Sequence, residues 1–538
     1  MELVRKTIHM IRQKGKAVSQ MTLDDDYNIP ETMPDAGMIV QEKGKIDIEE
    51  IKAENGRVLL RGALKFFILY MDDAEESSLH SVKGQIPFEE TMNVESAGDG
   101  DSLKLDWMLE DISAVLINSR KFGIKTVATL ELSVEELRDE EVPVAVEGTE
   151  GIKMKTCPMS AAALAVRKRD TSRIKDEIIL PANKPNIRQI IWQDTVMQGT
   201  ELRLAEGEVV IKGELVVFIL YEGEEEEGKA SWLEQILPFN SRVDVNGCQE
   251  GMVGSLKLEL AGADLEIKPD YDGELRVINI DAVLELDIRI YQEEKLDMIC
   301  DLYHPGMELI PTVSPVSYES LLVSNASKCR VSERLKTGGQ EPSILQLCHG
   351  SGEVKIDDCT VTEEGILVEG AVQVQILYVT SDDSHPMLCL KGLIPFEHQI
   401  EAPGIGRDSV YYLNAWLEQL SVDMVSSGEL EVKAVIQVHA LVFARRNLSC
   451  ITEITESPLD LDAVKALPGF LLYVAQPSDT LWDVAKAYRT TTERICELNG
   501  LASEDLRPGQ KLILVKEMGR GNLEEKESRV VKRSWMTG

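Results

Sequence analysis

The stretch GALKFFILY at residues 62–70 decides the fold, because similar runs return twice along the chain, as GELVVFILY at 213–221 and GAVQVQILY at 370–378. Each run begins with glycine and ends in Ile-Leu-Tyr. The β-branched and aromatic residues between these ends favour a largely buried β-strand. A run that recurs at wide, regular intervals indicates a repeated structural unit.

Two further anchors recur at fixed distances from these runs. A Pro-Phe pair begins seventeen residues after each tyrosine, and another proline lies 28 residues before each glycine. The pairs are Pro87-Phe88, Pro238-Phe239 and Pro395-Phe396, and the earlier prolines are Pro34, Pro185 and Pro342. The matching spacing of four anchors in three copies indicates a true repeat of roughly 150 residues.

Segments of alternating polarity surround each run, so we expect each repeat to fold as an all-β sandwich or barrel. The three β repeats are expected at residues 1–140, 160–303 and 320–450. Linkers are expected near residues 139–165, 304–320 and 455–469.

Basic side chains gather just ahead of each repeat. One interpretation is that they flank the opening strand and offset neighbouring acidic surface. The other is that the basic edge of one repeat docks against the acidic face of the next. Both remain open for the three groups, which are Arg12, Lys14 and Lys16; Arg167, Lys168 and Arg169; and Lys328, Arg330, Arg334 and Lys336.

The charge of the chain is strongly and unevenly acidic. Its 538 residues include 57 Lys plus Arg and 93 Asp plus Glu, which gives a formal net charge of −36, and 43% are hydrophobic, enough for several cores. Residues 1–470 carry −37, residues 471–515 carry −1 and residues 516–538 carry +2. Because such a surface repels phosphate, it argues against whole-body binding to nucleic acid or to an anionic bilayer.

Cysteine usage and the N-terminus indicate the compartment. The nine cysteines are an odd number without a CxxC pair, unlike a disulfide framework or a zinc ribbon. The first twenty residues lack the apolar run of a signal peptide, and no later stretch approaches the ~18 apolar residues of a membrane span. We expect a soluble, intracellular, reduced protein without a transmembrane segment.

A different kind of module follows Pro468-Gly469. Residues 471–475 are expected to form a strand, residues 481–488 and 491–498 two short helices, and residues 511–515 a second strand. This gives a small α+β domain of order βααβ at residues 470–516. Residues 517–538 are expected to form a flexible tail, with contact to an anionic membrane as the alternative.

The βααβ module resembles a LysM domain, on the Tyr-Val strand, Asp479-Thr480-Leu481 and Pro508-Gly509-Gln510. It departs from the family at Ser478, where LysM domains usually have glycine. LysM domains that bind N-acetylglucosamine polymers use a groove between the loop before the first helix and the loop after the second. The resemblance therefore implies a partner- or glycan-binding site at Ser478, Asp479, Thr480, Leu481, Asn499, Gly500 and Leu501.

Trp482 is the side chain that we add to this site. At 100° per residue it lies about 100° from Leu481 at the centre of the buried helical face, so much of its indole should be accessible. A partly exposed tryptophan is a strong contact for a sugar or a protein pocket. The alternative is that the indole lies flat over the domain's own helix.

Three such β repeats followed by one LysM domain resemble the SipL/SPOCS-domain family of spore coat morphogenetic proteins, with SpoVID as a functional counterpart. The resemblance covers most of residues 1–516. It implies a noncatalytic scaffold in the mother-cell cytosol, at the forespore surface, that docks through its LysM domain to SpoIVA, the coat ATPase of the basement layer. The alternative is a cell-wall protein whose LysM groove binds peptidoglycan or a chitin-type glycan.

Motifs of catalysis are missing from the sequence. There is no P-loop, dinucleotide-binding, H-E-x-x-H or G-x-S-x-G motif, so we expect no enzyme, no catalytic residue and no cofactor. Hydrolysis of wall polymer would need two placed carboxylates in a cleft, which a repeated β unit does not single out. The one gathering of soft ligands is irregularly spaced and confined to the third repeat, so we expect structural roles and no metal site for Cys348, His349, Cys359, His385 and Cys389.

Overall fold

The computed structural model describes residues 1–74, 77–98, 100–224, 229–338, 342–459 and 468–515. Each repeat contains six antiparallel strands. The first comprises β1 (Glu2–Asn28), β2 (Ala36–Glu54), β3 (Arg57–Asp72), β4 (Leu79–Asn93), β5 (Ser102–Asn118) and β6 (Lys121–Glu147). The second comprises β7 (Lys153–Ile179), β8 (Ile187–Ala205), β9 (Glu208–Gly223), β10 (Ala230–Asp244), β11 (Val253–Pro269) and β12 (Leu275–Tyr303). The third comprises β13 (Glu308–Lys336), β14 (Ile344–Val361), β15 (Gly365–Thr380), β16 (Met387–Glu401), β17 (Val410–Ser426) and β18 (Glu429–Ser457).

The six strands of each repeat form two three-stranded sheets with the same topology in every copy. In the first repeat the strand orders are β1-β6-β5 and β2-β3-β4, and the other repeats reproduce them strand for strand. The two sheets enclose one apolar core per repeat. The expectation of three all-β domains is therefore confirmed, in the form of a sandwich.

The recurring glycine and Pro-Phe pair are cross-strand partners. Gly62 lies opposite Phe88, Gly213 opposite Phe239 and Gly370 opposite Phe396. A Cβ atom on Gly370 would lie 2.2 Å from the backbone oxygen of Lys355 and 2.9 Å from the Phe396 ring. The motif therefore keeps glycine where a phenyl ring and a neighbouring backbone cover the strand.

The recurring tyrosine and the early proline are also joined. The Tyr70 hydroxyl donates to the carbonyl oxygen of Pro34 at 3.2 Å, and the Tyr221 hydroxyl donates to that of Pro185 at 3.2 Å. Tyr70 and Tyr221 are fully buried. A buried hydroxyl needs such a partner, which explains why the two anchors keep a constant separation in sequence.

The Ile-Leu-Tyr ending serves two cores at once. Ile68 and Tyr70 point into the core of the first repeat, whereas Leu69 points into a separate cluster at the centre of the molecule. Alternation across the strand allows one segment to bury both faces. The central cluster receives buried side chains from all three repeats: Val40, Leu69, Met71, Leu79, Trp192, Phe218, Leu220, Cys348, Leu377 and Met387.

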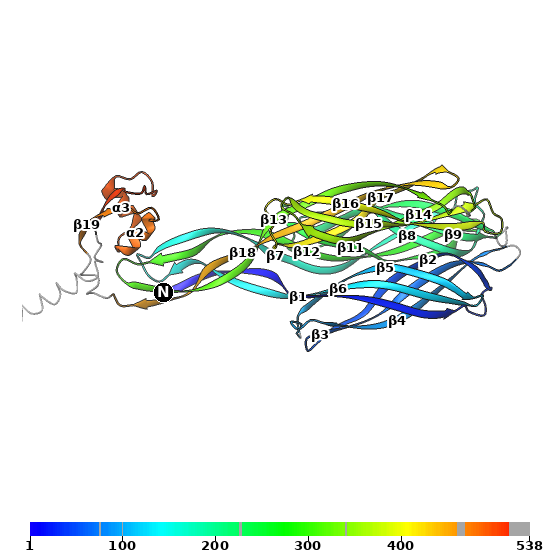
Figure 1. Cartoon of the computed structure of the whole chain (residues 1–538), viewed down its shortest axis with the longest axis horizontal. Coiled ribbons are helices and arrows are strands. Elements are labelled where there is room, and N and C mark those ends of the chain that lie inside the picture. The colour runs from blue at the N-terminus through cyan, green and yellow to red at the C-terminus, as the bar shows by residue number, and fades with distance from the viewer. Residues whose placement is uncertain (75–76, 99, 225–228, 339–341, 460–467, 516–538) are drawn as a thin grey trace, which may run out of the picture.

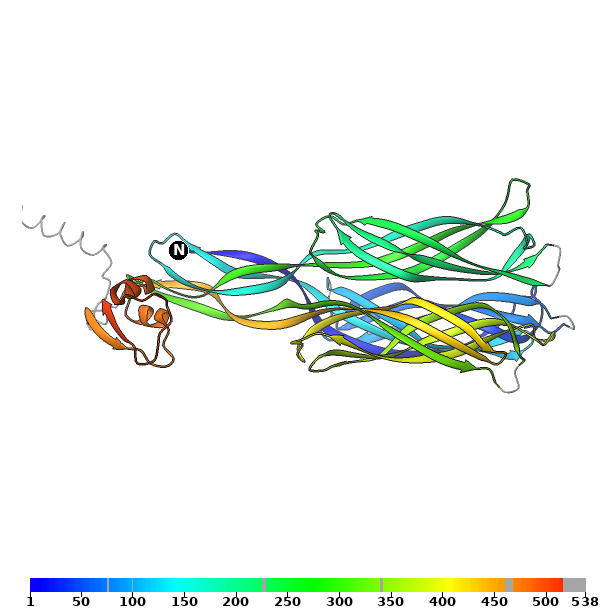
Figure 2. The same cartoon turned by 90° about the horizontal axis from the view of Figure 1, so that it is seen from above.

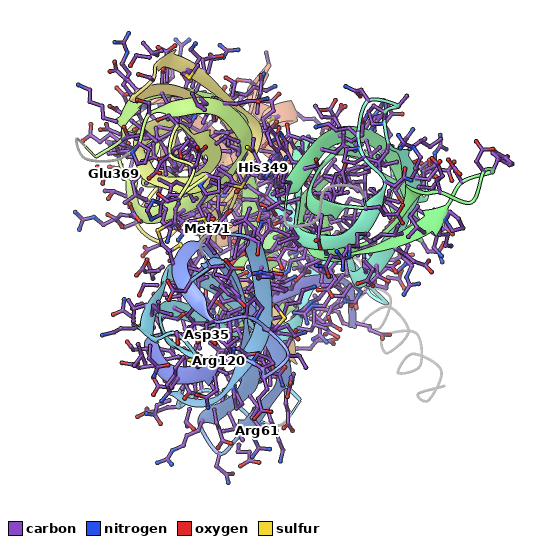
Figure 3. All side chains as sticks on the ribbon, turned by 90° about the vertical axis from the view of Figure 1, so that its right-hand side faces the viewer. Asp35, Arg61, Met71, Arg120, His349 and Glu369 are labelled. Carbon is purple, nitrogen blue, oxygen red and sulfur yellow. The ribbon has the colours of Figure 1, made fainter. Side chains whose placement is uncertain are left out.

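The three repeats pack side by side around a common axis, with Met71 and His349 near its centre (Figure 3). Lysines fix this arrangement by donating to backbone oxygens of the next repeat at its β-bulges. Lys45 donates to the carbonyls of Leu260 and Ala261, and Lys355 donates to those of Leu109 and Glu110. The bulges leave these carbonyls outside the regular pairing, so a charged donor from outside can satisfy them.

One buried ion pair joins the first two repeats near the base of the long strands. Arg289 donates to the Glu135 carboxylate at 2.6 Å, and both residues are almost inaccessible to solvent. Arg167, from one of the basic groups, reaches the same carboxylate at 3.1 Å. Tyr412 of the third repeat completes the junction with its ring 5.7 Å from the Arg289 guanidinium.

The longest strands continue beyond the sandwiches as a stalk (Figures 1 and 2). Here β1 pairs only with β6, β7 only with β12, and β13 only with β18. We call this part, residues 2–13, 136–147, 153–164, 292–303, 308–321 and 444–457, the stalk. Its interior holds side chains from all three hairpins, including Ile8, Met159 and Cys450.

The expectation of linkers at 139–165 and 304–320 is wrong, because most of these residues belong to stalk strands. Only short turns separate β6 from β7 and β12 from β13. Of the linker expected at 455–469, residues 455–457 belong to β18 and residues 460–467 lie outside the described part of the chain. The tail expected at 517–538 lies outside it as well.

Candidate docking site

The C-terminal domain lies at the far end of the stalk from the sandwiches (Figure 1). It comprises β19 (Phe470–Val474), α2 (Leu481–Ala487), α3 (Thr492–Asn499) and β20 (Lys511–Val515). Strands β19 and β20 pair antiparallel, and the helices cover one face of this hairpin. The expected βααβ order is confirmed. The core consists mainly of Leu481, Val484, Ala485, Ile495, Leu512 and Leu514.

Side chains of the loop before α2 mainly hold the loop together. Asp479 accepts hydrogen bonds from the Tyr473 hydroxyl at 2.5 Å and from the Gln476 amide at 2.8 Å. This hydrogen bond to Asp479 raises the pKa of the Tyr473 hydroxyl to about 12. Thr480 caps α2 by accepting from the Asp483 amide, and Leu481 is buried in the domain core. Of the candidate residues in this loop, Ser478 and Thr480 are exposed.

The second predicted loop is built in a similar way. The Asn499 amide donates to the carbonyls of Ile495 and Ile513, at 2.8 and 2.9 Å, and its oxygen accepts from the Ile513 amide. Gly500 ends α3 in the left-handed conformation, with φ of 63°, which glycine adopts without strain. Leu501 packs against the domain core. Asn499 therefore connects α3 to β20, and Gly500 is the exposed member of this group.

Trp482 contacts the stalk. Its indole nitrogen donates to the Asp301 carboxylate at 2.8 Å, and its ring meets Tyr303 edge-on with centroids 4.9 Å apart. The indole is half-buried between α2 and the end of β12. The indole therefore stays partly exposed and packs against the stalk instead of lying flat over its own helix.

The outer face of the β19–β20 hairpin is a surface that sequence reasoning missed. Phe470, Leu472 and Val474 are 64%, 55% and 44% exposed, on the face of β19 that points away from the helices. Val515 lies opposite Phe470 and Ile513 opposite Leu472, so an apolar strip crosses both strands. The signal was present in residues 470–474, FLLYV, which contain no charged residue.

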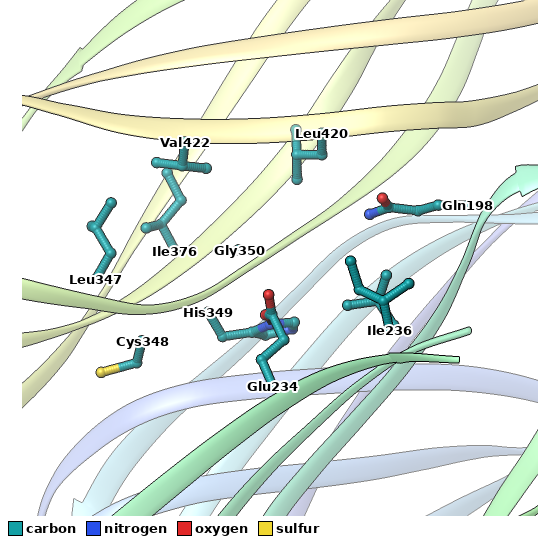
Figure 4. Close-up of a pocket in the computed structure, with 11 residues that line it drawn as sticks. Gln198, Glu234, Ile236, Leu347, Cys348, His349, Gly350, Ile376, Leu420 and Val422 are labelled. Carbon is teal, nitrogen blue, oxygen red and sulfur yellow. Dashed lines mark hydrogen bonds and ion pairs between the residues drawn. The ribbon is translucent and has the colours of Figure 1, made fainter. Parts of the chain in front are cut away.

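The sandwiches contain a cluster of charged and polar groups between the repeats, in which His349 and Asp194 are buried while Glu234 and Lys43 are partly exposed. His349 stacks on Phe218 with centroids 4.4 Å apart and bonds to the carboxylates of Glu234 at 2.6 Å and Asp194 at 3.3 Å. Asp194 also pairs with Lys43. Figure 4 shows His349 and Glu234 beside a cavity of about 270 Å³ at the junction of the second and third repeats. His349 belongs to the third repeat, whereas both of these carboxylates belong to the second repeat. The cluster is therefore a contact between repeats.

The soft ligands that we singled out do not converge. Among the residues that the structure describes, no group of three or more His, Cys, Asp or Glu side chains could hold a metal ion. Cys348 lies in the central cluster and Cys389 packs against it, and burial raises the pKa of each thiol to about 12. Cys359 packs against the core of the third repeat, and His385 bonds to Asp382 in an exposed loop.

We expect the stability of the sandwiches to depend on pH through His349. Burial lowers the pKa of His349, but the hydrogen bonds to Asp194 and Glu234 outweigh it and raise the pKa above 6.5. The imidazolium therefore stabilises the fold below about pH 6.5, and this contribution is lost as the pH rises through the raised pKa. Urea unfolding at a series of pH values should show a decline above pH 6.5 that is absent in His349→Gln. The exposed His385→Gln is the control, and an unchanged decline in His349→Gln would contradict the assignment.

The protein therefore consists of three β-sandwiches that pack side by side, a long stalk and a LysM-type terminal domain. The family model described as "SipL, SPOCS domain" matches residues 35–117, 186–268 and 343–425, and the LysM model matches residues 473–515. The chain therefore belongs to the SipL-like, SPOCS-domain proteins that carry a C-terminal LysM domain. No curated protein and no solved structure matches it. Each SPOCS match covers four strands, from β2 to β5 and their counterparts, and the long stalk-forming strands lie outside it.

The comparisons indicate no enzymatic family, since SPOCS and LysM domains are binding domains. Among the described residues, no helix is both long and apolar enough to cross a membrane.

Proposed function

We propose that the protein is a noncatalytic scaffold of spore coat assembly in the mother-cell cytosol, at the forespore surface. Its LysM domain docks to a SpoIVA-like ATPase of the coat basement layer, and its β repeats bind other coat proteins or further copies of the chain. The SPOCS and LysM domains fit a scaffold role, and the domain layout sets the three-repeat body apart from the LysM end.

The apolar strip on the outer face of β19 and β20 is the observation that carries the proposal. Exposed Phe470, Leu472 and Val474 form an apolar surface, which suits a protein face better than a hydrated sugar chain. The LysM segment carries a net charge of only −1, so a partner can approach it without the repulsion of the acidic body. The β19–β20 hairpin lies on the side of the domain away from the stalk (Figures 1 and 2).

Binding of an N-acetylglucosamine polymer is the second candidate, favoured by the LysM fold itself and by exposed Ser478 and Gly500 beside the predicted groove. Against it, Asp479, Thr480 and Asn499 already use their side chains within the domain. A glycan-binding protein should sediment with purified peptidoglycan and be released by chito-oligosaccharide. Sedimentation of this kind, with no binding to the ATPase, would replace the scaffold proposal.

A charged side chain in the strip should weaken docking. Leu472→Lys places an ammonium group at the centre of the apolar surface, and desolvating it against a partner should weaken binding of the full chain to a purified SpoIVA-like ATPase at least about tenfold. Ala502→Lys, at an exposed position of the loop after α3, is the charge-matched control. Equal binding by Leu472→Lys and wild type would show that the strip is not the docking surface.

A further inference from the structure

The LysM domain is seated on the free end of the stalk. This end, which we call the stalk tip, consists of Lys153 at the start of β7, Asp301 and Tyr303 at the end of β12, and Glu308 at the start of β13. The tip approaches the side of the LysM domain formed by α2, the start of α3 and the turn between them. This side is distinct from the apolar strip on β19 and β20.

Tyr303 gives the contact its buried centre. Its side chain belongs to the same apolar cluster as Leu481 and Val484 of α2, and it is only 6% exposed. Its hydroxyl donates to the carbonyl oxygen of Thr490 at 2.9 Å, in the turn that joins the two helices. A residue of the stalk thus completes the core of the LysM domain.

Complementary charges surround Tyr303. Asp301 accepts from the indole of Trp482 at 2.8 Å and from the ammonium group of Lys486 at 2.6 Å. Burial raises the pKa of Asp301, but the bonds from Lys486 and Trp482 outweigh it and bring the pKa below 3.8. Arg489 pairs with Glu308, so acidic groups of the tip receive basic groups of the LysM domain. The pair between Lys153 and Glu493, at 3.0 Å, has the opposite polarity and fixes the orientation.

The composition of this contact is that of a reversible interface. It has one aromatic centre and a polar rim of half-exposed ion pairs, whereas a permanent domain interface is larger and more apolar.

We propose that the stalk tip is an intramolecular docking site that covers Trp482 in the free chain, so that any partner using Trp482 must first displace the stalk. The inference goes beyond the proposed function, because it concerns two parts of one chain and is tested without a coat protein or a glycan. It assigns Trp482 to the stalk contact and leaves the apolar strip outside that contact.

Fluorine NMR of the full chain labelled with 5-fluorotryptophan tests the proposal. The resonance of Trp482 is identified by its absence from Trp482→Phe, and its exposure is measured by broadening with a soluble nitroxide. In the wild type the broadening should be weak. In Asp301→Lys/Glu308→Lys, which turns attraction to Lys486 and Arg489 into repulsion, it should rise several-fold.

Two further variants keep the outcome clear. Asp297→Lys makes the charge change of a single one of these two substitutions, at an exposed position of β12, and should leave the broadening unchanged. Lys486→Asp, added to Asp301→Lys, exchanges the two charges and should restore protection in part. Equal broadening in the wild type and in Asp301→Lys/Glu308→Lys, with the other tryptophan resonances unchanged, would overturn the proposal.

Discussion

Replacing Glu135 with alanine is expected to lower the free energy of unfolding by about 3–5 kcal/mol, because it leaves the buried guanidinium of Arg289 without its main partner. Arg289 is inaccessible within the junction of the three repeats, and its remaining ion pair, to Asp287, is longer, at 3.7 Å. Urea or guanidinium unfolding of the full chain, followed by far-UV circular dichroism, measures the loss.

Two variants separate the buried charge from a general effect of mutation. Glu131→Ala, four residues earlier on β6, removes a carboxylate from a half-exposed pair with Lys16 and should cost less than about 1 kcal/mol. Glu135→Met combined with Arg289→Met removes both buried charges and should recover most of the stability. A loss no greater for Glu135→Ala than for Glu131→Ala would contradict the account of the junction.

Leu220→Ala is expected to destabilise the packing of the three repeats by about 2–5 kcal/mol, because it opens a cavity in the central cluster. Leu220 is fully buried and lies between Ile219 and Tyr221, which belong to the core of the second repeat. The variant therefore reduces contact between the repeats while the second repeat keeps its own core. Thermal unfolding followed by calorimetry gives both the size of the loss and any separation of the repeats into independent transitions.

Leu393→Ala is the matched control, since Leu393 lies on β16 with 63% of its surface exposed. Its truncation should change stability by less than about 0.5 kcal/mol. If Leu220→Ala is as mild as Leu393→Ala, the repeats do not depend on the central cluster for their packing.

The repeat could be predicted from the sequence because its anchors recur at fixed spacing. The physical reason for that spacing could not be predicted from the sequence. Gly213 and Phe239 meet only through the register of β9 and β10, and Tyr221 reaches Pro185 only when the sandwich closes. The sequence also could not tell which of the basic residues ahead of each repeat contact another repeat and which pair within their own. Arg167 reaches Glu135 of the preceding repeat, as the docking interpretation required, whereas Lys14 pairs with Asp101 inside its own repeat.

The sequence did not predict the stalk, because the composition of the stalk strands resembles that of linkers between domains. Residues 139–147 combine acidic residues with Pro143, a pattern typical of a connection between domains. In the structure Pro143 lies beside a register shift of the β1–β6 pair, where the ladder is already interrupted and a missing amide donor costs little. Only the assembly of three hairpins gives these strands a common interior, and no single repeat contains that information.

The structure gives several residues of the candidate site in the LysM domain partners within the chain. Helical periodicity correctly placed Leu481 in the core and left Trp482 beside it, but could not foresee that Asp301, 181 residues earlier, would bind the indole. The resemblance to LysM domains directed attention to the loops. The apolar strip on Phe470, Leu472 and Val474 lies on the opposite side of the hairpin from the helices.

The central claim is that the protein is a noncatalytic scaffold and that its LysM domain brings the β repeats to the spore coat. Imaging of the fluorescently tagged protein during sporulation, with and without residues 470–516, tests it most directly. The account predicts that the full chain encircles the forespore and that the truncated chain spreads through the mother-cell cytosol. A truncated chain that still encircles the forespore, or a full chain that never does, would contradict it.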